Sequence, residues 1–169
     1  MPNSPLNILF LCTHNSARSI LAEALLNDMG GDKFRAFSAG SSPRQNQQPN
    51  PLALKALQSA GIRTDGLSSK SWDVFATSAT PDVPKMDLVI TVCDNAAGEV
   101  CPFWPRQPAT AHWGYADPSE VKGTDDERLA AFRQTMLTIQ KRLQLLISVP
   151  LARLSTLTLQ NEARNLSNA

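Results

Sequence analysis

The sequence predicts an α/β protein built on a parallel β-sheet. Short apolar runs alternate along the chain with segments that carry apolar residues at helical spacing. The runs at 7–12 and 86–92 are apolar almost throughout, which is typical of strands covered on both faces. Parallel strands need crossover connections, which are right-handed in nearly all proteins. The alternation therefore favours one sheet with helices packed against it.

Turn and cap residues mark the ends of the expected elements. Gly30-Gly31 ends the first helix and Asn50-Pro51 begins the second, while Thr124 and Glu127 form a capping box before the last. A short helical turn is expected near 72–76. Strands are expected at 7–12, 34–38, 86–92 and 109–113, and the main helices at 20–29, 50–60 and from 124 until Pro150 ends the last.

Length and charge exclude several classes of protein. A chain of 169 residues with a net charge of +1 fits one domain and carries no strongly basic nucleic-acid footprint. No apolar stretch reaches the ~18 residues that span a bilayer, and the first residues lack the layout of a signal peptide. We therefore expect a cytoplasmic protein that binds neither nucleic acid nor membrane. Residues 1–150 would form the domain, and 151–169 a C-terminal extension, helical or partly disordered.

The segment 8–19, ILFLCTHNSARS, joins a buried strand to a helix through a tight loop. Backbone N–H groups converge in such a loop and bind oxyanions. The helix terminus and Arg18 should lower the pKa of the Cys12 thiol and yield a thiolate nucleophile, and Arg18 can bind two oxygens of a phosphate-like ligand. Asn15 and Ser19 are suited to holding the loop. The predicted oxyanion-binding residues are Thr13, His14, Asn15, Ser16, Ala17, Arg18 and Ser19.

The pattern C-x-x-N-x-x-R-S at 12–19 resembles the phosphate-binding loop of the low-molecular-weight protein tyrosine phosphatase family, which includes arsenate reductases. The likeness continues through 38–40 (SAG), 87–89 (DLV) and Asp117-Pro118, and covers the chain to about Ser148. The resemblance implies a three-layer sandwich with a four-stranded parallel sheet. It also implies that Asp117 is the general acid that protonates the leaving oxygen. Taken alone, Asp117-Pro118 would more readily be interpreted as a simple turn, and it is the combination with the Cys12 loop that favours catalysis.

Three cysteines in a reducing compartment are buried bystanders, metal ligands or redox participants. A metal site formed with His112 matches no zinc spacing. The segments 92–105 and 112–118 are similar to those of arsenate reductases, which implies a redox role. Arsenate, with phosphate and sulfate as analogues, would be attacked by Cys12; Cys93 would then attack Cys12, and Cys101 would take over the disulfide. No cofactor is expected to bind tightly, and thioredoxin, or glutathione with glutaredoxin, would regenerate the thiols in this arsenic detoxification.

Other functions remain open at this stage. A phosphatase of the same family would hydrolyse phosphomonoesters through a Cys12 phosphocysteine, but such enzymes carry tyrosines where Ser119-Glu120 stand here. A non-enzymatic oxyanion sensor would need no general acid. Some arsenate reductases of this type also bind a monovalent cation, and the resemblance places potassium here at Asn15, Glu23, Ser38 and Asp73.

Overall fold

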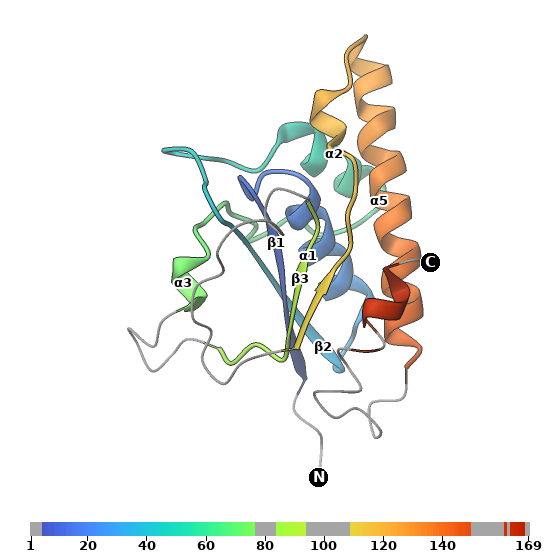
Figure 1. The fold of residues 1–169 in the computed structure, drawn as a ribbon. Coiled ribbons are helices and arrows are strands. Elements are labelled where there is room, and N and C mark those ends of the chain that lie inside the picture. Colours follow the sequence, from blue (N-terminus) through green and yellow to red (C-terminus); the bar gives the residue numbers. More distant parts are fainter. Residues whose placement is uncertain (1–4, 77–83, 94–108, 150–160, 162, 168–169) are drawn as a thin grey trace.

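A four-stranded parallel sheet forms the centre of the molecule, in the order β2-β1-β3-β4 (Figure 1). The computed structural model describes residues 5–76, 84–93, 109–149, 161 and 163–167. The strands are β1 (Leu6–Cys12), β2 (Phe34–Gly40), β3 (Leu88–Thr91) and β4 (Ala109–His112). The predicted four-stranded parallel sheet is confirmed. β3 is shorter than predicted, although the backbone N–H groups of Asp87 and Val92 still donate to β1.

The carboxyl ends of the strands meet at one edge of the sheet. Cys12 is paired with Gly40 across β1 and β2, while Leu11 is paired with Thr91 and Thr91 with His112. Cys93 follows β3 by two residues and therefore lies at the same edge. In parallel α/β sheets this edge is the usual position of a ligand site.

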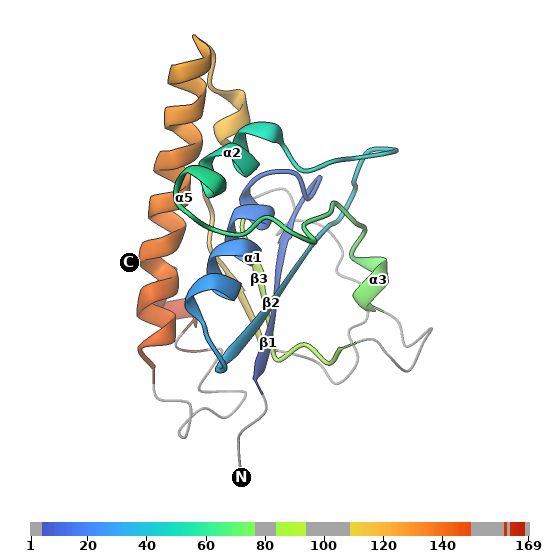
Figure 2. The same cartoon turned by 180° about the vertical axis from the view of Figure 1, so that it is seen from behind.

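Helices cover both faces of the sheet, which gives the predicted three layers. On one face α1 (Arg18–Met29), α2 (Pro51–Ser59) and α5 (Asp125–Ile147) pack over Ile8 and Phe10. On the other, residues of α3 (Asp73–Ala76) and its neighbours pack over Leu9 and Leu11. Figures 1 and 2 show α3 and α5 on opposite sides of the sheet. Because side chains alternate along a strand, a continuously apolar β1 supplies both cores.

The predicted caps fix where the helices begin. Asn50 Oδ1 accepts a hydrogen bond of 2.9 Å from the Leu52 N–H at the start of α2, and Thr124 Oγ1 accepts one of 3.1 Å from the Glu127 N–H at the start of α5. A short 3-10 helix, η1 (Pro118–Glu120), precedes α5. None of the helices in the described part of the chain has the length and apolar character needed to cross a bilayer.

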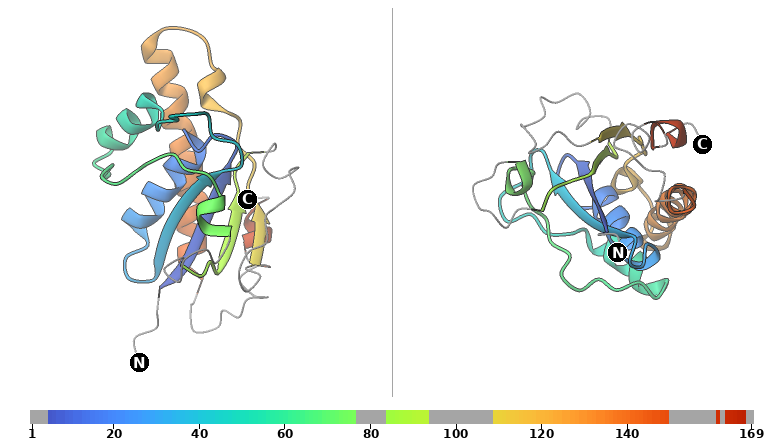
Figure 3. Two further views of the ribbon diagram at one scale, coloured as in Figure 1. Left: turned by 90° about the vertical axis from the view of Figure 1, so that its left-hand side faces the viewer. Right: turned by 90° about the horizontal axis from the view of Figure 1, so that it is seen from below.

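The described residues near the C-terminus contribute to the core. Residues 163–166 are helical, and Figure 3 shows them from two further sides. Ala163 is fully buried, and its carbonyl accepts a hydrogen bond of 2.8 Å from Trp113 Nε1. Arg164 Nε donates to the Thr110 carbonyl of β4 at 3.1 Å. Part of the segment predicted as an extension therefore covers the edge strand of the sheet.

Candidate active site

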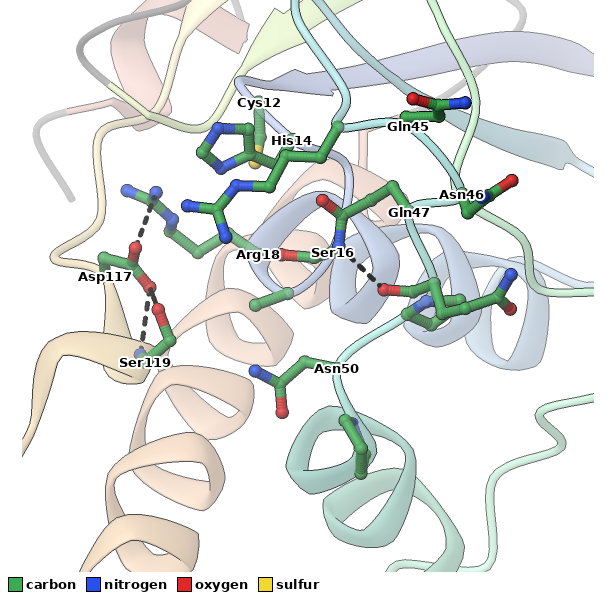
Figure 4. A pocket seen from close by; sticks show the side chains of 15 residues that line it. Cys12, His14, Ser16, Arg18, Gln45, Asn46, Gln47, Asn50, Asp117 and Ser119 are labelled. Atoms are coloured by element: carbon green, nitrogen blue, oxygen red, sulfur yellow. Dashed lines mark hydrogen bonds and ion pairs between the residues drawn. The ribbon is translucent and has the colours of Figure 1, made fainter.

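The loop between β1 and α1 forms the floor of a cavity of about 450 Å³ (Figure 4). Cys12 ends β1, and α1 begins at Arg18 after Ala17, whose side chain makes no capping hydrogen bond. The first N–H groups of α1 are therefore not capped by a side chain and are directed toward the loop, as in helix-terminal anion sites. Of the predicted oxyanion-binding residues, His14, Ser16, Ala17 and Arg18 line this cavity together with Cys12.

Asn15 holds the loop from its buried side. It has a left-handed backbone with φ of 55° and is fully buried. Its Nδ2 donates to Ser19 Oγ at 2.8 Å and to Ser38 Oγ at 3.0 Å. Its Oδ1 accepts from the Lys70 N–H at 2.9 Å, and its carbonyl accepts from Ser69 Oγ at 2.6 Å. Asparagine tolerates the left-handed region better than most residues, and these bonds compensate for what the conformation costs.

Gly40 lies where β2 comes closest to the loop. A Cβ atom at this position would lie 2.7 Å from the Thr13 carbonyl oxygen and 3.0 Å from the Asn15 nitrogen, so the site has no room for a side chain. The Ser41 and Ser42 N–H groups donate to the carbonyls of Cys12 and Thr13 at 3.0 and 2.8 Å. This close packing gives a physical reason for the glycine in the 38–40 segment.

The environment of Cys12 favours its thiolate. A hydrogen bond from Cys93 is the largest of the causes that lower the pKa of Cys12 to about 5, and the charge of Arg18 and hydrogen bonds from the Asn15 backbone and Ser19 add to it. These effects outweigh burial, which acts in the opposite direction. A pKa of about 5 favours the thiolate form of Cys12 at neutral pH, which is the form that a nucleophile in this loop requires.

Cys93 is brought against the loop from the end of β3. Cys12 and Cys93 are not joined in a disulfide, and both are buried. Thr13 Oγ1 lies 3.4 Å from Cys93 Sγ. A second cavity of about 360 Å³ is lined by Cys93 and Thr13 and shares His14, Arg18 and Asp117 with the first. Cys101, the third predicted thiol, lies outside the described residues.

Arg18 and Asp117 face each other at one side of the first cavity (Figure 4). Arg18 Nη2 lies 3.5 Å from Asp117 Oδ2, and Nη1 donates to the Tyr115 carbonyl at 2.9 Å. Arg18 Nε is buried and has no hydrogen-bond partner among the described residues, so a bound oxyanion would satisfy it. Asp117 Oδ1 accepts from the Ser119 N–H at 2.9 Å, which fixes the carboxylate at the rim.

Tyr115 and Arg142 support Arg18, and no local pattern in the sequence indicates either role. The Arg142 guanidinium lies 4.8 Å from the centre of the Tyr115 ring, a cation–π contact between α5 and the segment that holds Arg18. Burial raises the pKa of Tyr115 to about 12, against the opposing effect of Arg142. Tyr115 is therefore neutral across the physiological range.

The segment 44–50 forms the opposite wall of the cavity, where Figure 4 shows Gln45, Asn46 and Gln47. The Asn50 N–H donates to the Ser16 carbonyl at 2.8 Å and so fixes this segment to the loop. His14 is the only described lining residue that carries an aromatic ring. We expected the segment 41–51 to be an exposed loop, and its polar composition did not reveal that it lines the site.

The predicted cation site is only partly assembled. Asn15, Glu23 and Ser38 lie together, since Ser38 Oγ donates to Glu23 Oε1 and accepts from Asn15. Asp73 is instead exposed in the first turn of α3. The Lys70 ammonium donates to the Ser38 carbonyl at 3.2 Å, so the group of oxygens already holds a positive charge. These residues do not fit an additional potassium ion. Within the described residues, no group of three or more His, Cys, Asp or Glu side chains could hold a metal ion.

A buried thiolate and an arginine in a strand–loop–helix turn define an α/β protein that binds tetrahedral oxyanions and presents a sulfur nucleophile to them. The chain belongs to the low molecular weight phosphotyrosine protein phosphatase family, whose model matches residues 7–160.

Proteins named arsenate reductase are among the relatives and solved structures to which the chain is similar. The chain is 38% identical over 137 residues to a protein of Halalkalibacterium halodurans named arsenate reductase, covering 81% of this chain and 91% of that protein. The solved structure of an arsenate reductase in the reduced state superposes with a TM-score of 0.63 at 26% identity, covering 85% of this chain and 97% of the other. A thioredoxin-dependent arsenate reductase of Corynebacterium glutamicum gives a TM-score of 0.55 at 28% identity, covering 86% of this chain and 65% of that one.

Proposed function

We propose that the protein reduces arsenate to arsenite, using its own thiols as the source of two electrons. The observation that carries the proposal is the second buried thiol, Cys93, hydrogen-bonded to the Cys12 thiolate inside an oxyanion-binding loop. The relative of Halalkalibacterium halodurans that is named arsenate reductase supports the same reaction. Arsenate and phosphate are both tetrahedral oxyanions, so the family's loop suits either.

In the first step the Cys12 thiolate attacks arsenic, a sulfur–arsenic bond forms, and one oxygen leaves as water after protonation. Asp117 lies beside Arg18 at the rim of the cavity and is our candidate for the proton donor. Arg18 and the N–H groups at the start of α1 hold the remaining oxygens. The product is an arsenic(V) ester of Cys12.

In the second step the Cys93 sulfur attacks Cys12 Sγ. A sulfur–sulfur bond forms and the sulfur–arsenic bond breaks, with its electron pair remaining on arsenic, which leaves as arsenite. Cys101 then attacks Cys93 and releases the Cys12 thiolate. An external dithiol reduces the Cys93–Cys101 disulfide and closes the cycle.

We propose thioredoxin as that external dithiol, ahead of glutathione with glutaredoxin. The similar enzyme of Corynebacterium glutamicum is described as thioredoxin-dependent. A relay that ends in a disulfide between two cysteines of one chain suits a dithiol donor, because thiol–disulfide exchange regenerates both thiols together.

Phosphatase activity is the second candidate, at a low level. The Cys12 thiolate and Arg18 are sufficient for a phosphocysteine intermediate. The described cavity wall is, however, mainly amide-bearing, with Gln45, Asn46 and Gln47 where an aryl group would need an apolar surface. Hydrolysis also leaves Cys93 without a role.

The experiment follows NADPH consumption with arsenate in two parallel arms, one with thioredoxin and its reductase and one with glutathione, glutaredoxin and glutathione reductase. We expect turnover in the thioredoxin arm, and its loss in the variants Cys12→Ser, Cys93→Ser and Cys101→Ser. Hydrolysis of an aryl phosphate serves as the comparison. Hydrolysis much faster than arsenate reduction, and unchanged in Cys93→Ser, would make the protein a phosphatase.

A further inference from the structure

We propose that Lys70 is a positioning residue that supplies the oxyanion loop with a built-in monovalent cation. Its ammonium would neutralise Glu23 and thereby keep Asn15 and Ser19 oriented toward Cys12 without any added metal ion. The inference deepens the proposed function, because it concerns the same loop, but it also applies to oxyanion binding alone.

The position of the ammonium is fixed by oxygens. Lys70 Nζ donates to the Ser68 carbonyl at 2.6 Å and to the Ser38 carbonyl at 3.2 Å. Glu23, which is partly buried in α1, attracts the ammonium through its charge, although the described residues show no direct ion pair between the two groups. Burial raises the pKa of Glu23, and the hydrogen bond from Ser38 and then the charge of Lys70 oppose this effect. Burial lowers the pKa of Lys70, and the charge of Glu23 opposes it. The two charges therefore stabilise each other at a site where neither is well solvated.

A series of hydrogen bonds connects Glu23 to the Cys12 loop, and each bond has a defined donor and acceptor. Ser38 Oγ donates its hydrogen to Glu23, so it can only accept from Asn15 Nδ2. Asn15 uses the other hydrogen of Nδ2 on Ser19 Oγ, which leaves the hydroxyl hydrogen of Ser19 for the Cys12 thiolate. A protonated Glu23 would bind the Ser38 hydroxyl less strongly and would leave its hydrogen free to rotate. Charged Glu23 therefore holds the Ser38 hydrogen and turns the Ser38 lone pairs toward Asn15 Nδ2, and the charge of Lys70 helps to keep Glu23 ionised.

The backbone around Lys70 contacts the same asparagine. The Lys70 N–H donates to Asn15 Oδ1 and Ser69 Oγ donates to the Asn15 carbonyl. The ammonium and the backbone of one short segment therefore hold Asn15 from two directions. Since Asn15 has φ of 55°, the shape of the loop depends on these contacts.

The test compares Lys70→Ala with a matched control, Lys55→Ala, in which the lysine is exposed on α2. Assays with arsenate use chloride salts of potassium, ammonium, lithium and tetramethylammonium at equal ionic strength. We expect wild type and the control to be insensitive to the cation. Lys70→Ala should lose about tenfold in kcat/KM, mainly through KM, and potassium or ammonium should restore several-fold while tetramethylammonium does not.

A double-mutant cycle tests the electrostatic step. Glu23→Gln removes the charge that Lys70 neutralises, so Glu23→Gln/Lys70→Ala should be less impaired than the two single effects predict. Three results would each overturn the inference. The first is full activity in Lys70→Ala, and the second is a loss of activity in Lys70→Ala that no cation restores and that adds to the loss in Glu23→Gln. The third is a requirement of the wild-type protein for potassium.

Protection of Cys12 from iodoacetamide by inorganic phosphate separates this inference from the proposed function. If the wild-type protein binds phosphate but does not reduce arsenate, the proposed function fails while the role of Lys70 can still be tested. In that case we still expect Lys70→Ala to weaken the protection by phosphate about tenfold, and potassium to restore it. Equal protection in Lys70→Ala and wild type would overturn the role of Lys70, whatever the fate of arsenate.

Discussion

The two sides of the Cys12 loop differ in how their polar groups are satisfied. On the buried side, Asn15 and Ser19 are fully enclosed and hydrogen-bonded within the protein. On the cavity side, Arg18 presents a buried Nε with no partner among the described residues, next to the Cys12 thiolate. The buried side therefore fixes the shape of the loop, and the cavity side carries its chemistry. Because the buried hydrogen bonds hold the loop rigid, the cavity side can leave polar groups available for an oxyanion.

The largest effect expected from the buried side follows Asn15→Ala. It leaves the hydroxyls of Ser19 and Ser38 without their donor and puts alanine at φ of 55°. We expect a loss of about 3 kcal/mol in the free energy of unfolding and about 100-fold in kcat/KM for arsenate. Urea denaturation and steady-state kinetics measure the two.

Asn46→Ala is the control, because Asn46 has a similar φ of 59° but is exposed. It should cost less than about 1 kcal/mol in unfolding free energy. If Asn15→Ala and Asn46→Ala lost the same amount of unfolding free energy, the left-handed backbone, rather than the buried hydrogen bonds, would account for the effect.

A smaller effect is expected at Gly40. The added methyl group of Gly40→Ala would meet the Thr13 carbonyl at 2.7 Å, so the loop must shift. We expect a loss of about 2 kcal/mol in stability and a weaker affinity for phosphate. Gly66→Ala changes a glycine with φ of 78° that has no atom within 4 Å of its added carbon, so it should cost about 1 kcal/mol and leave phosphate affinity intact. A phosphate affinity that drops in both variants would indicate general destabilisation.

On the cavity side, the smallest expected change concerns the pKa of Cys12. Its thiolate forms as the pH rises through about 5, so the rate of Cys12 alkylation should rise there and level off toward neutral pH. Cys93→Ala removes the hydrogen bond that lowers this pKa most, so the inflection should move to higher pH. Cys93→Ser keeps a hydroxyl donor and should shift it less. Mass spectrometry of the Cys12 peptide after timed iodoacetamide treatment gives the profile, and an unmoved inflection in Cys93→Ala would contradict the role of the hydrogen bond.

The sequence predicts the Cys12 loop itself better than the segments that pack against it. Cys12 and Arg18 lie in one short stretch after an apolar strand, so local spacing is enough to bring them together. The parallel sheet could also be predicted from the sequence, because buried parallel strands appear as continuous apolar runs. Lys70 and Ser69, in contrast, meet Asn15 across 55 and 54 residues of chain, and a lysine in a polar segment carries no sign of what it contacts. The resemblance, rather than spacing, indicated that Cys93 belongs with Cys12.

The most direct test of the central claim is a single turnover of Cys101→Ser with arsenate and no external reductant. We predict that about one arsenite is released per chain, and that peptide mapping then finds Cys12 and Cys93 joined in a disulfide. Cys93→Ser, treated in the same way, should release none. Arsenite release from Cys93→Ser equal to that from Cys101→Ser, or release without a Cys12–Cys93 disulfide, would contradict the account.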